Sequence, residues 1–195
     1  MKNKAIYFLL GLSFLFITAC DHLASGSLHG SKAPANTILI EFQHVNYAWG
    51  YIDNRSFLTV DGKLAVFFTR DREDPRLNQW IEPDAGGWLE EEDLVANYSM
   101  ADSTFQVIEA QALRDHNVAT LAQLVEENLS EPEGRCIDFG VMTLWAYQWD
   151  EEAKKYRRQL IEQCGDLAIK NENENAQQLI EALNELALFT RGCCF

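Results

Sequence analysis

Two aspartates of this sequence, Asp138 and Asp166, are candidates for a pair of carboxylates that lie close together in the fold. Asp138 and Asp166 flank a segment of alternating side chains that is expected to turn back on itself near residue 152. In an antiparallel strand pair with that turn, residue 138 lies opposite residue 166, because both are fourteen residues from it. Two carboxylates so close repel each other, so that one of them holds a proton or the pair binds a cation. Acid–base pairs of hydrolases are built in this way.

The alternative is a register one residue different, or two carboxylates that cap loop amides at strand ends. We favour this alternative, which leaves the catalytic residues unassigned. The sequence has no GxSxG, P-loop, dinucleotide-binding, HExxH or EF-hand pattern, so neither a cofactor nor a metal site is expected. His22 and His29 are expected to be solvated residues of a linker, and His116 a residue on the polar face of a helix.

Cysteines offer a second kind of chemistry. Besides Cys20, the chain has Cys136, Cys164, Cys193 and Cys194, and an even number in an exported domain permits two disulfides. The register above puts Cys136 and Cys164 four residues out of step, roughly 13 Å at strand rise, which is too far for a disulfide. We therefore expect Cys193 or Cys194 to bond to Cys136 or Cys164. The alternative is buried thiols.

Tryptophans in predicted loops are the candidates for contact with a partner protein. Trp49, Trp80 and Trp88 lie in such loops, and tryptophan is enriched at the energetic centres of interfaces. The other large aromatic residues alternate along predicted strands, which is typical of a core rather than of a ligand groove.

The first half of the chain is expected to place these residues on strands and loops. Residues 37–42 are apolar and β-branched, which predicts a strand. Residues 56–60 and 63–68 flank Asp61-Gly62, a pattern typical of a β-hairpin. An irregular excursion over 70–87 and a short helix over 90–98 follow.

The second half alternates between helices and strands. A helix is expected from Asp102 or Ser103 to about 129, with a kink near His116. Residues 137–149 alternate and predict a strand, which is apolar on both faces in its middle, and 155–163 predict its partner. Asn171 or Asn173 is expected to cap a final amphipathic helix.

The amino terminus indicates where the protein resides. Lys2 and Lys4 precede a fifteen-residue run without charge, which is shorter than the roughly 20 residues of a spanning helix and is typical of a secretory signal peptide. Its last four residues have the order aliphatic, small, small, cysteine: Ile17, Thr18, Ala19 and Cys20. The segment resembles the lipobox of bacterial lipoproteins, and the alternative is an ordinary signal peptide that happens to contain a cysteine. The resemblance implies cleavage before Cys20 and its lipidation, and Asp21 favours the inner membrane, facing the periplasm.

Charge narrows the classes of partner. The chain has a net charge of −14, and without Lys2 and Lys4 the mature form has 14 basic and 30 acidic residues, a net charge of −16. Such a surface disfavours nucleic acid, and attachment to the membrane is expected through the lipid anchor alone. The full chain is 47% hydrophobic, which argues against a disordered protein. The part that remains after removal of residues 1–19 is long enough to form a folded core.

The sequence as a whole predicts three regions: a signal peptide over 1–19, the lipidated Cys20 and a flexible tether over 20–36, and one globular domain over 37–195. The expected fold is α+β, an antiparallel sheet of about five strands with about three helices mainly on one face. The expected function is that of an envelope lipoprotein that binds another protein, as an adaptor or inhibitor, and we favour a protein that is not an enzyme. The alternative is a hydrolase or small-ligand binder that uses Asp138 and Asp166.

Overall fold

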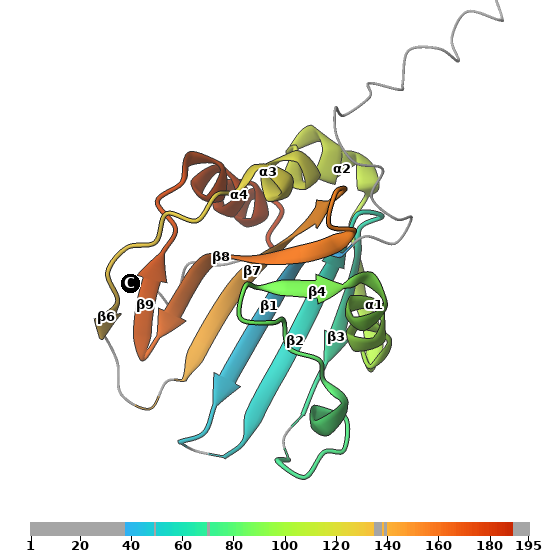
Figure 1. Cartoon of the computed structure of the whole chain (residues 1–195), viewed down its shortest axis with the longest axis vertical. Coiled ribbons are helices and arrows are strands. Elements are labelled where there is room, and N and C mark those ends of the chain that lie inside the picture. Colours follow the sequence, from blue (N-terminus) through green and yellow to red (C-terminus); the bar gives the residue numbers. More distant parts are fainter. Residues whose placement is uncertain (1–37, 49, 70, 135–137, 139, 189–195) are drawn as a thin grey trace, which may run out of the picture. The chain divides into compact units, whose positions relative to one another are not determined.

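The computed structural model describes residues 38–48, 50–69, 71–134, 138 and 140–188. This part of the chain is α+β, as predicted (Figure 1). Its strands are β1 (Ile38–Asn46), β2 (Ile52–Thr59), β3 (Lys63–Phe67), β4 (Trp88–Glu90), β5 (Ser103–Val107), β6 (Glu133–Gly134), β7 (Val141–Asp150), β8 (Lys155–Gly165) and β9 (Leu167–Lys170). Its helices are the 3-10 helix η1 (Leu77–Gln79) and the α-helices α1 (Glu91–Ser99), α2 (Ala110–Asp115), α3 (Val118–Leu124) and α4 (Glu174–Glu185).

The strands of the described residues form one antiparallel sheet in the order β5-β3-β2-β1-β7-β8-β9-β6, and β4 pairs with β8 off this path. The prediction of about five strands was too low. The missed strands, β4, β5, β6 and β9, have only two to five residues each, too few to show an alternating pattern.

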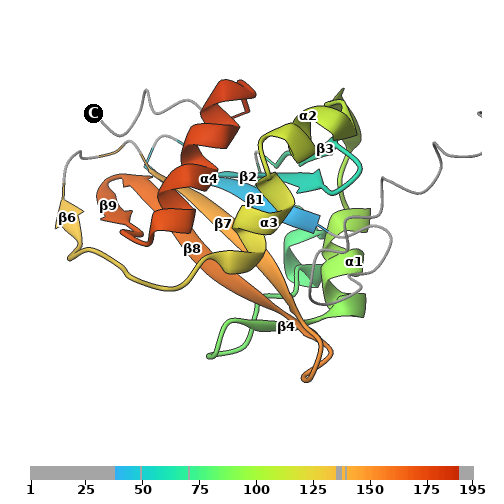
Figure 2. The same cartoon turned by 90° about the horizontal axis from the view of Figure 1, so that it is seen from above.

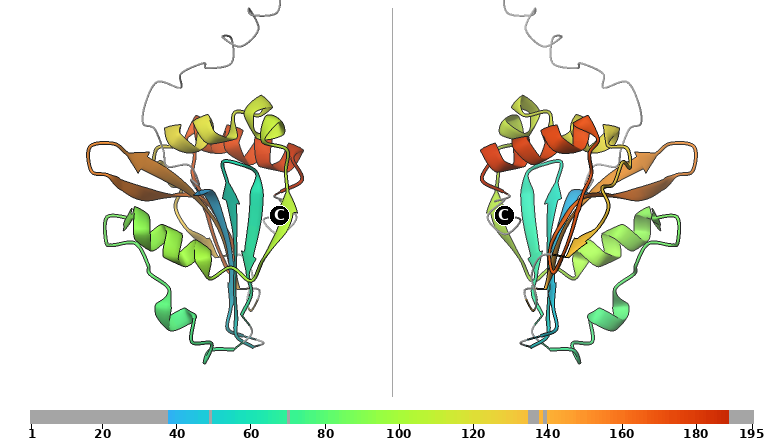
Figure 3. Two further views of the ribbon diagram at one scale, coloured as in Figure 1. Left: turned by 90° about the vertical axis from the view of Figure 1, so that its right-hand side faces the viewer. Right: turned by 90° about the vertical axis from the view of Figure 1, so that its left-hand side faces the viewer.

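Helices cover the two faces of the sheet unequally. Figures 2 and 3 show α2, α3 and α4 together on one side, and α1 on the other. The first face packs on the helices through an apolar cluster that includes Ile40, Leu144 and Leu179. The second face has a smaller cluster, in which Phe57 and Tyr147 of the sheet meet Leu94 of α1. No helix within the described part of the chain is long and apolar enough to cross a membrane.

The β2–β3 hairpin is confirmed, but its turn differs from the predicted one. The amide of Gly62 donates to the carbonyl of Thr59 at 2.9 Å, so the loop has three residues rather than two. Only Gly62 of the Asp61-Gly62 pair has a positive φ, +86°. This is the usual form of a three-residue hairpin loop, in which a turn is followed by a left-handed glycine.

The long helix predicted from residue 102 or 103 to about 129 is wrong. Its first part is the strand β5, because the amide of Asp102 donates to Val66 and leads the chain along β3. The rest is divided into α2 and α3 at Asn117, whose φ is +54°, close to the predicted kink. Of the apolar positions of the predicted helix, Val118 and Val125 are buried, whereas Leu129 lies beyond α3 and is exposed.

The β7–β8 hairpin has a different register from the predicted one. Its tight turn pairs Asp150 with Lys155, and an irregularity beside Trp145 then shifts the pairing by one residue. Beyond this bulge, Val141 lies opposite Gly165, and β7 begins there rather than at residue 137. The predicted opposition of residues 138 and 166 is therefore wrong. The prediction that both faces of β7 are covered is confirmed, since Leu144 and Tyr147 belong to the clusters on opposite faces.

The final helix is confirmed as α4. The side chain of Asn173 accepts hydrogen bonds from the amides of Asn175 and Ala176 and thereby caps the helix. The other candidate cap, Asn171, is fully buried and instead donates to the carbonyls of Glu126 and Leu160.

Replacing Gly62 tests the hairpin loop. A Cβ at this position would lie 2.0 Å from the carbonyl oxygen of Ile108, and its φ disfavours a β-branched residue. We expect Gly62→Val to lower the free energy of unfolding by at least about 1 kcal/mol, measured by thermal or chemical denaturation. Gly134→Val is the control, because its Cβ would have no neighbour nearer than 4.0 Å. Equal melting temperatures for the two variants would contradict this account of the loop.

Candidate functional site

The structure does not make an opposed pair of Asp138 and Asp166. Asp138 is exposed, and its backbone oxygen accepts a hydrogen bond from the side chain of Asn46 at 3.3 Å. Asp166 lies between β8 and β9, where its Oδ2 accepts from the amide of Gly140 at 3.2 Å. The Asp166 carboxylate thus caps a loop amide, which is the alternative that the sequence left open.

Two of the three candidate tryptophans lie within the described residues, and Trp49 lies outside them. Trp80 is half-buried rather than exposed: its ring stacks on Phe57 at 5.7 Å, and the guanidinium of Arg55 lies 3.9 Å from its centre. Trp88 begins β4, so its predicted place in a loop was wrong, and the guanidinium of Arg157 lies 5.8 Å from its ring. Trp80 is therefore part of the second cluster.

Cys164 is the only cysteine among the described residues. It is buried on β8 opposite Met142 and is disulfide-bonded, so its partner lies outside the described residues. Cys20, Cys136, Cys193 and Cys194 all lie outside them. The argument against a Cys136–Cys164 bond loses its basis, because it depended on the register that the structure corrects.

Of the three histidines considered in the sequence, the structure describes only His116. His22 and His29 lie outside the described residues. His116 ends α2, half-buried, with its Nδ1 3.0 Å from a carboxylate oxygen of Glu185 in α4. Within the described ranges, no three histidine, cysteine, aspartate or glutamate side chains gather in a way that could hold a metal ion.

A buried carboxylate that sequence analysis missed lies on the second face of the sheet. Glu41 of β1 has no solvent-exposed surface. It accepts hydrogen bonds from the hydroxyl of Tyr147 in β7 at 2.5 Å and from Nη1 of Arg55 in β2 at 3.2 Å. Nη1 of Arg158, in β8, lies 3.8 Å away. Four neighbouring strands thus meet at one carboxylate.

Two more carboxylates complete this arrangement, which we name the Glu41 network: Glu41, Asp53, Arg55, Glu82, Tyr147 and Arg158. Nε and Nη2 of Arg55 donate to the two oxygens of Asp53 at 3.1 and 3.2 Å. Both arginines also reach Glu82, at 3.1 Å from Arg55 and 3.2 Å from Arg158. Three carboxylates face two guanidinium groups, a net charge of −1 with the tyrosine neutral.

The electrostatics of the network shift the pKa values of Arg55 and Tyr147. Burial lowers the pKa of Arg55, but the attraction of Glu41, Asp53 and Glu82 outweighs it and raises that pKa above its usual value. Burial, followed by the negative charge of Glu41, raises the pKa of Tyr147 well above 10. Tyr147 therefore remains a hydrogen-bond donor at any physiological pH.

The Glu41 network is closed to a substrate. Glu41 and Tyr147 are buried, and of the carboxylates only Glu82 reaches the surface, with its side chain 55% exposed. Through Arg55 and Arg158, the network holds the segment that contains Trp80 and Glu82 on the sheet. Its sequence signal was a glutamate at an inward position of a strand otherwise rich in apolar residues.

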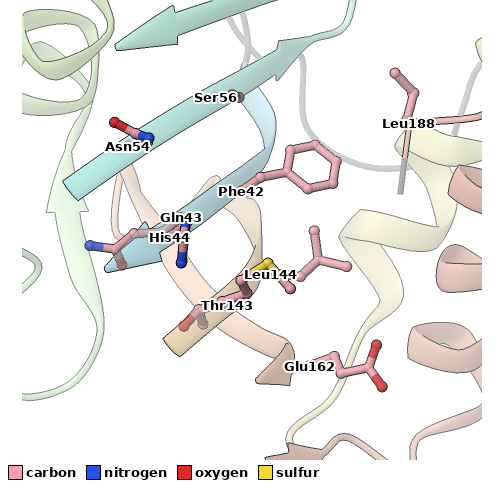
Figure 4. A pocket seen from close by; sticks show the side chains of 10 residues that line it. Phe42, Gln43, His44, Asn54, Ser56, Thr143, Leu144, Glu162 and Leu188 are labelled. Atoms are coloured by element: carbon pink, nitrogen blue, oxygen red, sulfur yellow. The ribbon is translucent and has the colours of Figure 1, made fainter. Parts of the chain in front are cut away.

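A cavity of about 250 Å³ lies on the helix-covered face, beside the end of α4 (Figure 4). Two cross-strand rows contribute to its lining: Ser56, Phe42, Leu144 and Glu162 in the first, and Asn54, His44 and Met142 in the second. Nε2 of His44 is buried without a hydrogen-bond partner in the described structure. None of the described residues that line the cavity is a lysine or an arginine, so this lining suits a small, mainly apolar molecule better than an anion.

A third feature is the sheet edge formed by β5. Every residue of β5 is exposed, and Phe105 and Val107 are 71% and 69% exposed. Val60, in the loop between β2 and β3, and Phe68, directly after β3, are exposed as well. We use the name β5 edge for the strand β5, which includes Phe105 and Val107, together with Val60 and Phe68.

No protein-family model, curated protein or solved structure matches this chain.

Removing the hydroxyl of Tyr147 tests the network. A tyrosine of the unfolded chain loses its proton near pH 10, whereas the raised pKa keeps Tyr147 protonated in the folded state, so stability falls as the pH rises above about 10. We expect Tyr147→Phe to lose about 1–3 kcal/mol at neutral pH, because Glu41 loses a donor. Its melting temperature should then decline less than that of the wild type between about pH 9 and 11.

The matched control is Tyr47→Phe, because the side chain of Tyr47 is exposed. This variant should retain the alkaline decline of the wild type. A decline as steep in Tyr147→Phe as in the wild type would show that Tyr147 does not hold its proton in the way described.

Proposed function

We propose that this protein is a lipid-anchored lipoprotein of the bacterial envelope whose acidic domain binds another protein, as an adaptor or an inhibitor. The observation that carries the binding function is the β5 edge. Large exposed apolar side chains on a monomer mark interaction sites when they are contiguous. Four of the nine such side chains among the described residues belong to this part of the sheet: Phe105 and Val107 lie in β5, Phe68 directly follows β3, and Val60 lies in the loop before β3.

The anchoring half of the proposal is supported by the sequence. Ile17, Thr18, Ala19 and Cys20 have the lipobox order after an uncharged run, and Asp21 favours retention in the inner membrane. The net charge of −14 supports a protein partner rather than nucleic acid.

The second candidate function is the binding of a small ligand. The observation in its favour is the cavity lined by Phe42, His44 and Met142, since a buried imidazole nitrogen without a partner gains from a ligand that bonds to it. A hydrolase that uses Asp138 and Asp166 has less support, because the carboxylate of Asp166 already accepts from a backbone amide.

Replacing Cys20 tests the anchor. We expect Cys20→Ser to abolish metabolic labelling with a palmitate analogue, because the acylated sulfur is gone, and to leave the protein uncleaved or released from the membrane. Ser25→Ala, in the tether, is the control and should be labelled normally. Persistent labelling of Cys20→Ser would contradict lipidation at this residue, and recovery of the wild type mainly in the outer membrane would contradict the role given to Asp21.

Site-directed cross-linking in the native cells tests partner binding. A photoreactive phenylalanine analogue placed at position 105 should join the protein to one specific partner, because this side chain is the most exposed of the β5 edge. The same analogue at position 95, on the exposed side of α1, is the control and should give no such product. No cross-link at 105, or equal products at both positions, would contradict binding through the β5 edge.

A further inference from the structure

We infer that the β5 edge receives an extended, basic segment of the partner protein, which adds to the sheet as a further strand beyond β5. This inference rests on the proposed binding function and specifies its mode and the chemistry of the partner. The first observation is the place of β5, which ends the sheet formed by the described strands and pairs among them with β3 alone. A terminal strand offers a row of backbone donors and acceptors to another chain.

The second observation is that β5 has no charged side chain and no proline, two of the features with which proteins block sheet edges. Very short strands and bulges are other such features. β5 reads Ser-Thr-Phe-Gln-Val, with neither a charge nor a proline. The opposite edge, β6, has only two residues, one of them Glu133, and follows Pro132. Only one of the two edges described is therefore open to strand addition.

The irregularity within β5 fits this role. The pairing with β3 shifts between Leu64 and Ala65, so that Gln106 and Thr104 have partners there and Phe105 has none. A bulge in a strand pair changes the direction in which the side chain of the extra residue points. Phe105 is the most exposed large apolar residue described, and Val107 lies two positions away. Phe105 and Val107 can therefore contact apolar side chains of an added strand whose backbone pairs with that of β5.

The charge of the residues around β5 indicates whether a second copy of this chain or a different protein binds at the edge. Among the described residues, Asp102 directly precedes β5 and Glu109 follows it by two positions. Asp102 shares Arg76 with Asp74, and Lys63, opposite Val107, pairs with Asp61, so that these six side chains comprise four carboxylates and two cations. This local excess of −2 has the sign of the whole chain, so two copies repel each other at this edge. A segment that carries lysine or arginine beside its apolar residues is attracted instead.

Selection of displayed random peptides on the full lipidated chain, held in detergent micelles, tests the inference. We expect the selected peptides to alternate apolar residues with others, to carry lysine or arginine, and to lack acidic residues. On binding, they should protect the amides of residues 103–107 from hydrogen exchange in the wild-type protein. This readout needs no variant, so it does not depend on the folding of one.

Matched variants locate the site. Phe105→Lys and Val107→Lys place a charge on the edge and should weaken peptide binding by about tenfold or more. Val95→Lys, on α1, adds the same charge at another exposed valine and should bind as the wild type does. All three positions are exposed, so each variant should stay within about 0.5 kcal/mol of the wild-type stability.

The outcomes separate this inference from the proposed function. Peptides that bind but ignore Phe105→Lys and Val107→Lys, or a selection that yields no peptide, would overturn strand addition, even if cross-linking finds a partner. Self-association of the wild type in sedimentation experiments, lost in Phe105→Lys, would overturn the basic partner in favour of a second copy. Peptide binding at β5 without any cross-linked partner in cells would count against the proposed function instead.

Discussion

A carboxylate without access to water determines how the central strands of this protein fit together. Glu41 has donors on β2 and β7 and a nearby guanidinium on β8. Removing the charged partner of a buried ion pair, as Arg55 is to Glu41, typically costs about 3–5 kcal/mol. Because alternate residues of a strand face opposite sides of the sheet, a slip by one residue would move a partner of Glu41 to the other face. The network therefore selects one register of four strands, beyond whatever it contributes to stability.

The same network explains how the second face is covered without a layer of long helices. Arg55 and Arg158 reach outward to Glu82, and the guanidinium of Arg55 lies on the ring of Trp80. Asn97 of α1 then holds the same segment by exchanging hydrogen bonds with the backbone of Ile81. On this face, polar contacts position a chain segment that has almost no regular structure of its own.

Sequence analysis predicted the elements whose patterns are local. The hairpin about Gly62, the helix capped by Asn173 and the alternating strand before residue 150 are each determined by residues within one element. It failed where a distant contact decides. Residues 103–107 are a strand because β3 lies beside them, and the register of β7 and β8 depends on a bulge that no local pattern shows. Within the Glu41 network, Glu41 and Tyr147 are 106 positions apart, so the sequence alone shows only an unusual glutamate in an apolar strand.

The pairing of β1 with β7 also governs the order in which the molecule can be built. Ile40 lies opposite Ala146, so the centre of the sheet cannot close until most of the chain has been synthesised. Until then, β1, β2 and β3 are a three-stranded meander whose first strand has an open side and a glutamate with no tyrosine to bind. Topologies dominated by such distant pairings fold in milliseconds to seconds. During this interval β3 can already pair with β5, whereas the open side of β1 must wait for the carboxyl-terminal half of the chain.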